Sequence, residues 1–369
     1  MIITKYSYNE ESTWNFQQLN LQDLNLIVGK TSSGKTRIIN TLINFSKLFK
    51  QDKGELRAGN WEIGFKLNKD DVIEYNYKLS INRQQNITSE KLEKNGTTLL
   101  EFDGNTLVIE NDRIEGLSPQ MMALKTFSRK MNFEEIISNF QDIFLRRHNP
   151  GVGKEGNELT SLKKLSLLKD EETFLKAIRK SDTISPETGF YFLKKFDKKN
   201  FDELKKAFST CFPCATDIDL LPIEEVPSIR VDDIIDKEKL YCVCIKEQGQ
   251  WIPRFEVSSG MHRFIEALVD IYTPPHNSII IYDEFENGLD PFVIGALVDI
   301  YLEKLFEHQY IFTSHHPYII DKIPPKNWII VRRKGYVVEN FPGSNVEQDE
   351  DSLSGNFISL LNSIEYRGA

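Results

Sequence analysis

A glycine-rich loop between an apolar run and a helical pattern constrains this fold more than any other feature. The stretch from residue 25 to residue 42 reads NLIVGKTSSGKTRIINTL and fits the pattern G-x-x-x-x-G-K-[ST] without a mismatch. The flanks predict a buried strand before the loop (Leu24, Leu26, Ile27, Val28) and a helix after it (Ile38, Ile39, Leu42, Ile43, Leu48). A strand, a tight loop and a helix start together predict a polyphosphate site.

The loop and the first helical turn are expected to bind the phosphates of ATP. The glycines let backbone N–H groups turn inward, and the helix N-terminus adds a positive dipole end. Lys35 would reach the β- and γ-phosphates, and Thr36 would hold Mg²⁺. The predicted ATP-binding residues are Gly29, Lys30, Thr31, Ser32, Ser33, Gly34, Lys35, Thr36 and Arg37.

A second stretch, SIIIYDEFENGLDP from residue 278 to 291, supplies adjacent carboxylates after an apolar run. Four large apolar residues, 279–282, predict a central parallel strand buried on both faces. Open α/β sheets bind ligands beyond the C-terminal ends of their strands. Asp283 is therefore predicted to bind Mg²⁺, directly or through water, and Glu284 to polarise the attacking water.

Two further patterns are weak when taken alone. Ser258-Ser259-Gly260 precedes a helical run and offers hydroxyls and N–H groups to an anion, but it also fits an ordinary helix cap. The segment YIFTSHHP, residues 310–317, is a predicted strand that ends at His315. A histidine there could contact a γ-phosphate or serve the structure only.

The order and spacing of these four pieces resemble the ABC-type ATPase heads of the SMC/RecF class. The resemblance covers about the first 115 residues and about 240–340, with a helical block as the variable insertion. The chain is especially similar to soluble bacterial ATPases grouped with the OLD family and with antiphage systems such as PARIS, Septu and some retrons. The implied fold is α/β: a P-loop NTPase head of the ABC/SMC type, with a strand-rich N-terminal lobe and an inserted α-helical lobe.

The resemblance also implies roles for residues. The Walker A loop would be 29–36, and the signature motif would comprise Ser258, Ser259, Gly260 and Met261, preceded by Val257 where leucine is usual. Asp290 would belong to the D-loop, and His315 would be the switch histidine, with His316 as the alternative. The Q-loop is not obvious. Gln120 is assigned because it begins the helical block, with Gln84 or Gln85 as the fallback.

In this class the signature serine of one subunit caps the ATP held by the Walker A loop of the other. The resemblance therefore implies a homo-oligomer built on a two-fold dimer of heads, with ATP and Mg²⁺ as cofactors. The remaining chain after the last core strand is too short for an OLD-type nuclease, so a separate effector protein is expected as partner.

Bulk properties describe an ordinary soluble protein with 40% hydrophobic and 27% charged residues. The net charge of −9 gives the whole molecule no electrostatic case for nucleic-acid binding. No apolar run approaches the ~18 residues needed to span a bilayer, and the N-terminus lacks the pattern of a signal peptide. The prediction is a cytoplasmic protein without a membrane segment.

Periodicity divides the chain into four predicted parts. Residues 1–117 and 239–345 are expected to form the two halves of the ATPase core, 118–238 an inserted helical lobe, and 346–369 an acidic linker with a short helix. Residues 61–115 alternate like antiparallel strands. Helical spacing begins near Leu117 and includes Ile143 and Phe144, a loop is expected at 148–158, and the acidic run is 347–351.

Two clusters leave alternatives open. Cys211, Cys214, Cys242 and Cys244 could form a four-thiolate zinc site or be reduced thiols, the second pair sharing one strand face in a core. The segment 190–201 mixes aromatic residues with lysines and could contact a nucleic-acid backbone, but an amphipathic helix with a solvated lysine face is favoured.

The sequence thus predicts an ATP hydrolase that dimerises around ATP and Mg²⁺ and controls a partner effector, in bacterial antiphage defence. One rival is a DNA-repair ATPase that binds duplex DNA in an ATP-dependent way through the helical block, where residues 118–210 carry 18 Lys/Arg against 13 Asp/Glu. Another is the soluble subunit of a transporter. Two features argue against the transporter: the strand-rich N-terminal lobe and the expected absence of an aromatic residue that serves the Walker A loop from the preceding segment.

Overall fold

A computed structural model describes residues 1–10, 13–51, 57–129, 133–147, 160–180, 184–226, 240–305, 307–346 and 355–367. The predicted loop 148–158 and the acidic run 347–351 lie outside the described residues. The chain forms two compact units, which are described separately: residues 1–145, 276–285 and 305–369 in the first, and 146–275 and 286–304 in the second.

The first unit is built on one sheet of 14 strands in the order β10-β15-β16-β3-β17-β18-β2-β1-β4-β5-β6-β7-β8-β9. Its N-terminal strands are β1 (Ile2–Glu10), β2 (Trp14–Asn20), β3 (Leu24–Val28), β4 (Gly59–Lys66), β5 (Tyr75–Ile81), β6 (Ile87–Lys94), β7 (Thr97–Phe102), β8 (Thr106–Ile109) and β9 (Asp112–Glu115). The later strands are β10 (Ile143–Arg147), β15 (Ile279–Asp283), β16 (Gln309–Thr313), β17 (Trp328–Lys334) and β18 (Val337–Pro342).

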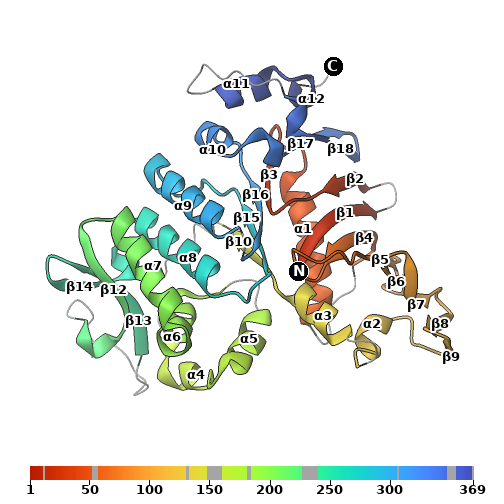
Figure 1. The fold of residues 1–369 in the computed structure, drawn as a ribbon, viewed down its shortest axis with the longest axis horizontal. Helices are drawn as coiled ribbons and strands as arrows, with labels where there is room; N and C mark the ends of the chain where they lie inside the picture. The colour runs from red at the N-terminus through yellow and green to blue at the C-terminus, as the bar shows by residue number, and fades with distance from the viewer. Residues whose placement is uncertain are drawn as a thin grey trace. The chain divides into compact units, whose positions relative to one another are not determined.

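Strands from opposite ends of the chain alternate at the centre of this sheet. The early strand β3 lies between β16 and β17 and is parallel to both, and β16 is in turn parallel to β15 (Figure 1). Every residue of β3, β15 and β16 is buried, as expected for parallel strands covered on both faces. The parallel strands therefore present their C-terminal ends at one edge, where the phosphate loop and the carboxylates both follow.

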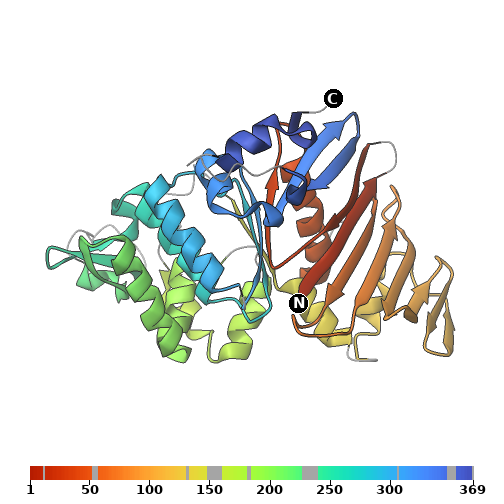
Figure 2. The ribbon, with the colours of Figure 1, turned by 45° about the horizontal axis from the view of Figure 1, so that its top comes forward.

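The N-terminal half of the sheet is antiparallel from β2 through β9, and helix α1 (Lys35–Lys50) packs against one of its faces (Figure 2). Alternation puts Ile63 and Phe65 of β4 in the core with Phe45 of α1, while Glu62 faces outward. The other helices of this unit are α2 (Ala123–Thr126), α3 (Phe133–Gln141), α10 (Pro317–Lys322), α11 (Gly355–Asn362) and α12 (Ile364–Arg367). The predicted strand-rich lobe is confirmed.

Two features of this unit differ from the sequence predictions. Ile143 and Phe144 belong to strand β10, not to a helix, and the amide of Ile279 at the start of β15 donates to Asp142 O, 3.0 Å away. A short apolar run is compatible with the spacing of a helix or of a strand. Here the segment forms a strand because it lies beside β15 in the sheet. Strand β2 was also overlooked, because the polar residues at its exposed positions hide the alternation.

The second unit combines helices with a four-stranded sheet. Its strands are β11 (Thr160–Ser161), β12 (Ala215–Pro222), β13 (Leu240–Glu247) and β14 (Gln250–Pro253), all paired on β13. Its helices are α4 (Leu162–Ser166), α5 (Glu171–Arg179), α6 (Pro186–Phe196), α7 (Lys198–Cys211), α8 (Ser259–Tyr272) and α9 (Pro291–Glu303). Strand β12 was not predicted. The unit borders also differ from the predicted ranges, because α2 and α3 pack in the first unit.

Helices α6 and α7 are amphipathic, as the favoured interpretation of the segment 190–201 predicts. Phe190, Leu193 and Phe201 are buried. Several lysines of these helices form ion pairs, for example Lys194 with Asp219 at 2.8 Å and Lys205 with Asp217 at 2.6 Å. Part of the positive charge of this block is therefore neutralised within the unit.

Within the described residues, no helix combines the length and apolar character needed to cross a membrane. Cys242 and Cys244 are buried on β13, Cys211 is buried at the end of α7, and Cys214 is exposed. Among the residues that the structure describes, no three His, Cys, Asp or Glu side chains gather as a metal-binding group. The two pairs of cysteines therefore have no four-thiolate geometry here.

A buried carboxylate organises the strand-rich lobe. Glu90 of β6 is fully buried and accepts hydrogen bonds from Tyr77 Oη at 2.8 Å, Ala123 N at 2.6 Å and Leu124 N at 2.9 Å. Burial raises the pKa of Glu90, and the two backbone N–H groups oppose that rise. Glu90 thus ties α2 to the sheet.

Replacing Glu90 by alanine should destabilise the protein by about 3 kcal/mol, since three buried donors lose their acceptor. The measurement is urea unfolding followed by circular dichroism. The control is Glu93→Ala, which removes a 3.0 Å pair with Lys91 and a 3.5 Å hydrogen bond from Asn76 near the surface and should cost less than about 1 kcal/mol. Equal losses in the two variants would contradict the role assigned to Glu90.

Candidate nucleotide and metal site

The phosphate loop joins β3 to α1 in the predicted order. Gly34 has a φ of +105°, and a Cβ at this position would lie 2.5 Å from the Trp14 ring. A Cβ on Gly29 would lie 2.4 Å from Val331 O. Both positions therefore require glycine. At Gly34 the backbone conformation is left-handed, and at both Gly29 and Gly34 a side chain would clash with a neighbouring residue. Among the described residues, no side chain caps the N-terminus of α1, so its first N–H groups suit an anion.

The lysine of the motif lies inside the loop. Lys35 Nζ donates to the carbonyl oxygens of Gly29 at 2.7 Å and Lys30 at 3.2 Å. Ser33 is buried beside Gly29, whereas Thr31 and Ser32 are exposed. The loop carbonyls thus hold the Lys35 ammonium group inside the loop, where it could interact with the negative charge of a bound phosphate.

Two other residues predicted to bind ATP have partners outside the loop. Lys30 Nζ donates to Arg367 O of α12 at 2.9 Å. The Arg37 guanidinium lies 4.6 Å from the centre of the Trp14 ring and pairs with Glu10 at 3.3 Å. Arg37 also lines a hollow of about 520 Å³ with Gln85, the fallback residue for the Q-loop.

The aromatic residue Trp14 was missed by sequence reasoning. Contrary to the expectation, an aromatic residue does precede the phosphate loop and contacts it at Gly34. Its ring is only 1% exposed and is covered by Arg37 and Arg333. The sequence signal for this contact was the tryptophan itself, which begins strand β2 shortly before the phosphate loop.

The carboxylate after β15 meets the hydroxyl that follows the motif lysine. Asp283 is buried, and its Oδ1 accepts from Thr36 Oγ1 at 3.2 Å and from Thr313 Oγ1 at 2.8 Å. The three residues come from three neighbouring segments: the start of α1, the end of β15 and the end of β16. The two predicted metal ligands, Thr36 and Asp283, are therefore brought together, while Thr313 was not predicted.

The predicted catalytic residues flank this contact. Glu284 is exposed, has a φ of +56°, and its N–H donates to Thr313 Oγ1 at 2.8 Å. His315 is exposed just beyond β16. His316 is half-buried, and its backbone N–H donates to Ser314 Oγ at 3.0 Å as α10 begins.

Gln120 is not brought to this edge by any described contact. It is exposed in the turn before α2 and has no hydrogen bond among the described residues. The neighbouring Pro119 O accepts from Ile87 N at the start of β6. The strand beside β15 is β10, and it does not contain Gln120.

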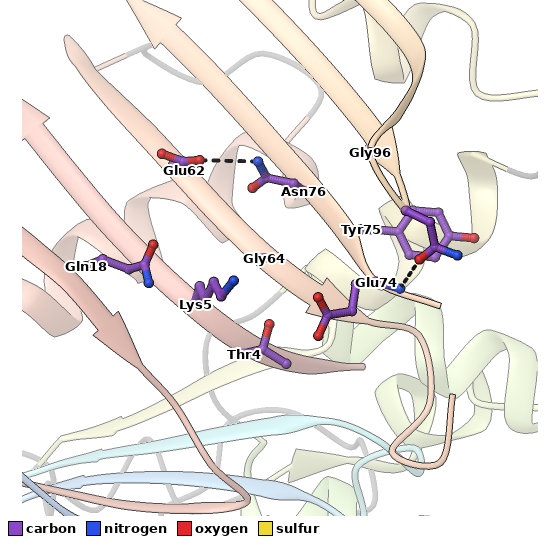
Figure 3. Close-up of a pocket in the computed structure, with 10 residues that line it drawn as sticks. Thr4, Lys5, Gln18, Glu62, Gly64, Glu74, Tyr75, Asn76 and Gly96 are labelled. Atoms are coloured by element: carbon purple, nitrogen blue, oxygen red, sulfur yellow. Dashed lines mark hydrogen bonds between the residues drawn. The ribbon is translucent and has the colours of Figure 1, made fainter. Parts of the chain in front are cut away.

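The outer face of the strand-rich lobe carries a separate hollow of about 280 Å³ (Figure 3). Gly64 leaves space between Lys5 and Asn76, and Asn76 donates to Glu62 at 3.2 Å. None of the predicted site residues lines this hollow. It is therefore distinct from the phosphate loop.

The predicted signature residues lie in the second unit, at the start of α8. Ser258 caps the helix by accepting from Met261 N at 3.3 Å, and both Ser258 and Ser259 are exposed. Asp290 caps α9 in the same way through Phe292 N at 2.9 Å. A Cβ built on Gly260 would lie 3.9 Å from Asp290 Oδ2, so the predicted signature and D-loop residues are adjacent.

Comparison with known proteins agrees with this arrangement. Residues 161–321 match the family described as "AAA domain, putative AbiEii toxin, Type IV TA system". In sequence, no curated protein matches the chain. Among solved structures, it is similar to the SmcHead bound to the C-winged helix domain of ScpA, with a TM-score of 0.56 and 13% identity over 92% of this chain and 98% of that one.

A second similar structure is an Smc head domain with an extended coiled coil bound to the C-terminal domain of ScpA, derived from Pyrococcus furiosus. Its TM-score is 0.52, with 12% identity over 92% of this chain and 95% of the other. The TM-scores indicate a shared fold, and at this low identity the likeness shows the fold alone. The chain has the fold of an ABC/SMC-type ATPase head.

Helix α8, which begins with the predicted signature residues, carries a buried ionic network that sequence reasoning missed. Arg146 donates to both oxygens of Asp270, at 2.7 and 2.6 Å, and lies 3.6 Å from Glu266. Glu266 also pairs with Arg263 at 3.3 Å and lies 3.7 Å from His262. Arg146 is far in sequence from the acidic residues of α8, so only the fold shows that they meet.

The network continues to both sides of α8. Arg254 donates to Glu187 of α6 at 2.6 Å and lies 2.8 Å from His262 Nε2. On the other side, Arg263 Nε donates to Asn287 O at 3.3 Å, next to the predicted D-loop. Helix α8 is thus linked by charged groups to α6 and to the segment before α9.

Acid should weaken this network. Burial acts to raise the pKa of Glu266, but the His262 hydrogen bond and the charges of Arg146 and Arg263 outweigh it and lower that pKa to about 2. A carboxyl with a lowered folded-state pKa stabilises above its unfolded pKa of about 4.3 and loses that contribution as the pH falls toward 2.

The stability difference between wild type and Glu266→Gln should therefore be largest above pH 5, up to about 3 kcal/mol, and shrink toward pH 2. Urea unfolding at a series of pH values measures it. A difference that stays constant from pH 6 to pH 2.5 would show that the ionised carboxylate contributes nothing.

Proposed function

We propose that this chain is a Mg²⁺-dependent ATP hydrolase that works as a dimer of heads. The contact that carries the proposal is Asp283 Oδ1, which accepts from Thr36 and Thr313 with Glu284 directly beside it. A hydroxyl from the phosphate-loop helix and a buried carboxylate at one sheet edge form the donor set of a metal–nucleotide site. The ABC/SMC-type fold supports the same function.

The loop fits a polyphosphate. Gly29 and Gly34 leave no Cβ in the cradle, the N-terminus of α1 has no side-chain cap among the described residues, and Lys35 lies within the loop. These groups would bind the phosphates of ATP through backbone N–H groups and one ammonium. Lys30 and Arg37, whose side chains have other partners, would contribute mainly backbone.

The oxygen atoms of Thr36 and Asp283 also fit Mg²⁺. Because the Thr36 hydroxyl donates its proton to Asp283, its lone pairs remain directed elsewhere and could bind a cation. Mg²⁺ held there would neutralise charge on the transferred phosphoryl group. Glu284, exposed beside this pair, would align and polarise the attacking water, and His315 would contact the γ-phosphate.

The exposed start of α8 supports a role between two copies. Ser258 and Ser259 are open to a partner, with Gly260 and Met261 completing the helix start near Asp290. We propose that this surface of one copy caps the ATP bound by the other, which closes a two-fold dimer. Hydrolysis would release the closure.

Control of a separate effector protein, in the bacterial cytoplasm and in antiphage defence, is the proposed biological role. The family description names a toxin of a toxin–antitoxin system, and the similar heads were solved bound to a domain of ScpA. Both support a head that acts through a partner. The proposal concerns the kind of partner and not its identity.

The alternative is ATP-dependent binding to duplex DNA. The observation in its favour is the hollow beside α1, which is lined by Arg37, Arg57 and Arg83. The helical block favours it less than the sequence indicated, because lysines such as Lys194 and Lys205 are paired with carboxylates. Filter binding to duplex DNA with and without ATP at two salt concentrations separates the two functions.

The substitution Glu284→Gln should reduce the ATP turnover rate at least about 100-fold, because the amide cannot accept the proton of water. The variant should also accumulate as a dimer in ATP and Mg²⁺, since closure would no longer be released. Phosphate release and light scattering after size exclusion measure the two effects. Lys35→Ala is the control that should fail in both nucleotide binding and dimer formation.

Wild-type turnover per molecule should rise with protein concentration if two copies form the site. A Glu284→Gln protein that stays monomeric in ATP, together with turnover that does not depend on concentration, would reject the dimer.

A further inference from the structure

Thr313 occupies the C-terminal end of β16, between the strand that leads to the phosphate loop and the strand that leads to the carboxylates. It is fully buried, with a relative exposure of 0%. No predicted role involved this residue, because a threonine at a strand end is ordinary in sequence. Its importance depends on what its hydroxyl contacts.

The hydroxyl of Thr313 joins the two acidic residues of the site. It donates its single proton to Asp283 Oδ1 at 2.8 Å and accepts the backbone N–H of Glu284 at 2.8 Å. A hydroxyl has one donor and two acceptor positions, so each contact uses a different function of the group. The adjoining Phe285 N–H donates to Thr313 O at 3.1 Å, which fixes the same turn from its other side.

The backbone of Glu284 needs such support. Its φ of +56° is in the left-handed region, which is unfavourable for a residue with a Cβ. The hydrogen bonds to Thr313 Oγ1 and Thr313 O are directly before and after the Cα of Glu284. They hold a conformation that sets the direction of an exposed carboxylate.

We propose that Thr313 is a positioning residue for ATP hydrolysis, acting through Glu284 and Asp283 rather than on the nucleotide. Its hydroxyl holds the Glu284 backbone in the left-handed turn and orients the Asp283 carboxylate at the same time. The inference rests on the proposed function, since it assigns Thr313 a part in that reaction. It predicts that loss of the hydroxyl slows chemistry while nucleotide binding without metal is retained.

The test compares Thr313→Val, which keeps the size of the side chain and removes the hydroxyl, with Thr313→Ser, which keeps the hydroxyl. We expect Thr313→Val to lower kcat by about 10- to 100-fold with KM changed less than about threefold. Thr313→Ser should restore kcat to within about threefold of wild type. Thr313→Ala replaces the valine variant if thermal unfolding shows that valine does not fold.

A double-mutant cycle identifies the residue through which Thr313 acts. At Mg²⁺ concentrations that saturate every variant, so that weaker metal binding through Asp283 has no effect on the rate, Thr313→Val in a Glu284→Gln background should slow single-turnover hydrolysis no further, because the Glu284 carboxylate that it positions is already gone. If the rate reductions caused by Thr313→Val and Glu284→Gln multiply in the double variant, the inference is overturned. A Thr313→Val enzyme with wild-type kcat, or a serine variant as slow as the valine variant, would overturn it as well.

A second arm does not need turnover. The Mg²⁺ concentration that gives half of the metal-dependent strengthening of nucleotide binding should rise several-fold in Thr313→Val and stay unchanged in Thr313→Ser, read with a fluorescent ADP. Unchanged Mg²⁺ dependence in both would contradict the orientation of Asp283. If wild type binds Mg²⁺ and ADP but hydrolyses no ATP, the proposed hydrolase fails and the part of Thr313 in hydrolysis fails with it, whereas this arm still decides whether Thr313 orients Asp283.

Discussion

One carboxylate oxygen, Asp283 Oδ1, is the point on which the rest of the site depends. It accepts hydroxyls from Thr36 and Thr313, so the helix after the phosphate loop and the two strands beside it are joined at a buried position. Charge-assisted hydrogen bonds of this kind are stronger than neutral ones and specify geometry. Removing the carboxylate would leave two hydroxyls without an acceptor.

The strand order makes this contact attainable. Because β3 pairs with β16 and β16 with β15, segments almost the whole chain length apart end side by side. All three strands are buried, so hydrophobic burial fixes their register and thereby the positions of the polar residues that follow. Stability of the sheet and geometry of the site thus share one cause. The glycines of the loop also contribute to the geometry of the site, because Gly34 allows the close approach of Trp14.

Much of this was predictable because the decisive signals are local. The motif from Gly29 to Thr36, with apolar flanks, predicted a strand, a loop and a helix, and Ile279–Asp283 predicted a buried strand.

What could not be predicted depends on the partner strands and on distant groups. Ile143 fits a helix until it pairs beside β15, and Thr313 has no signal of its own until the sheet brings it to Asp283. Glu266 likewise depends on Arg146, 120 positions away in the chain. The contact of Trp14 with the phosphate loop could have been predicted from the sequence but was missed.

The most direct test of the central claim is the effect of Mg²⁺ on ATP affinity in the Asp283→Asn protein, measured by isothermal titration calorimetry. If Thr36 and Asp283 form the metal site, Mg²⁺ strengthens ATP binding by wild type, and the amide variant loses that increment while keeping its metal-free affinity. An Asp283→Asn protein that gains as much affinity from Mg²⁺ as wild type would contradict the account.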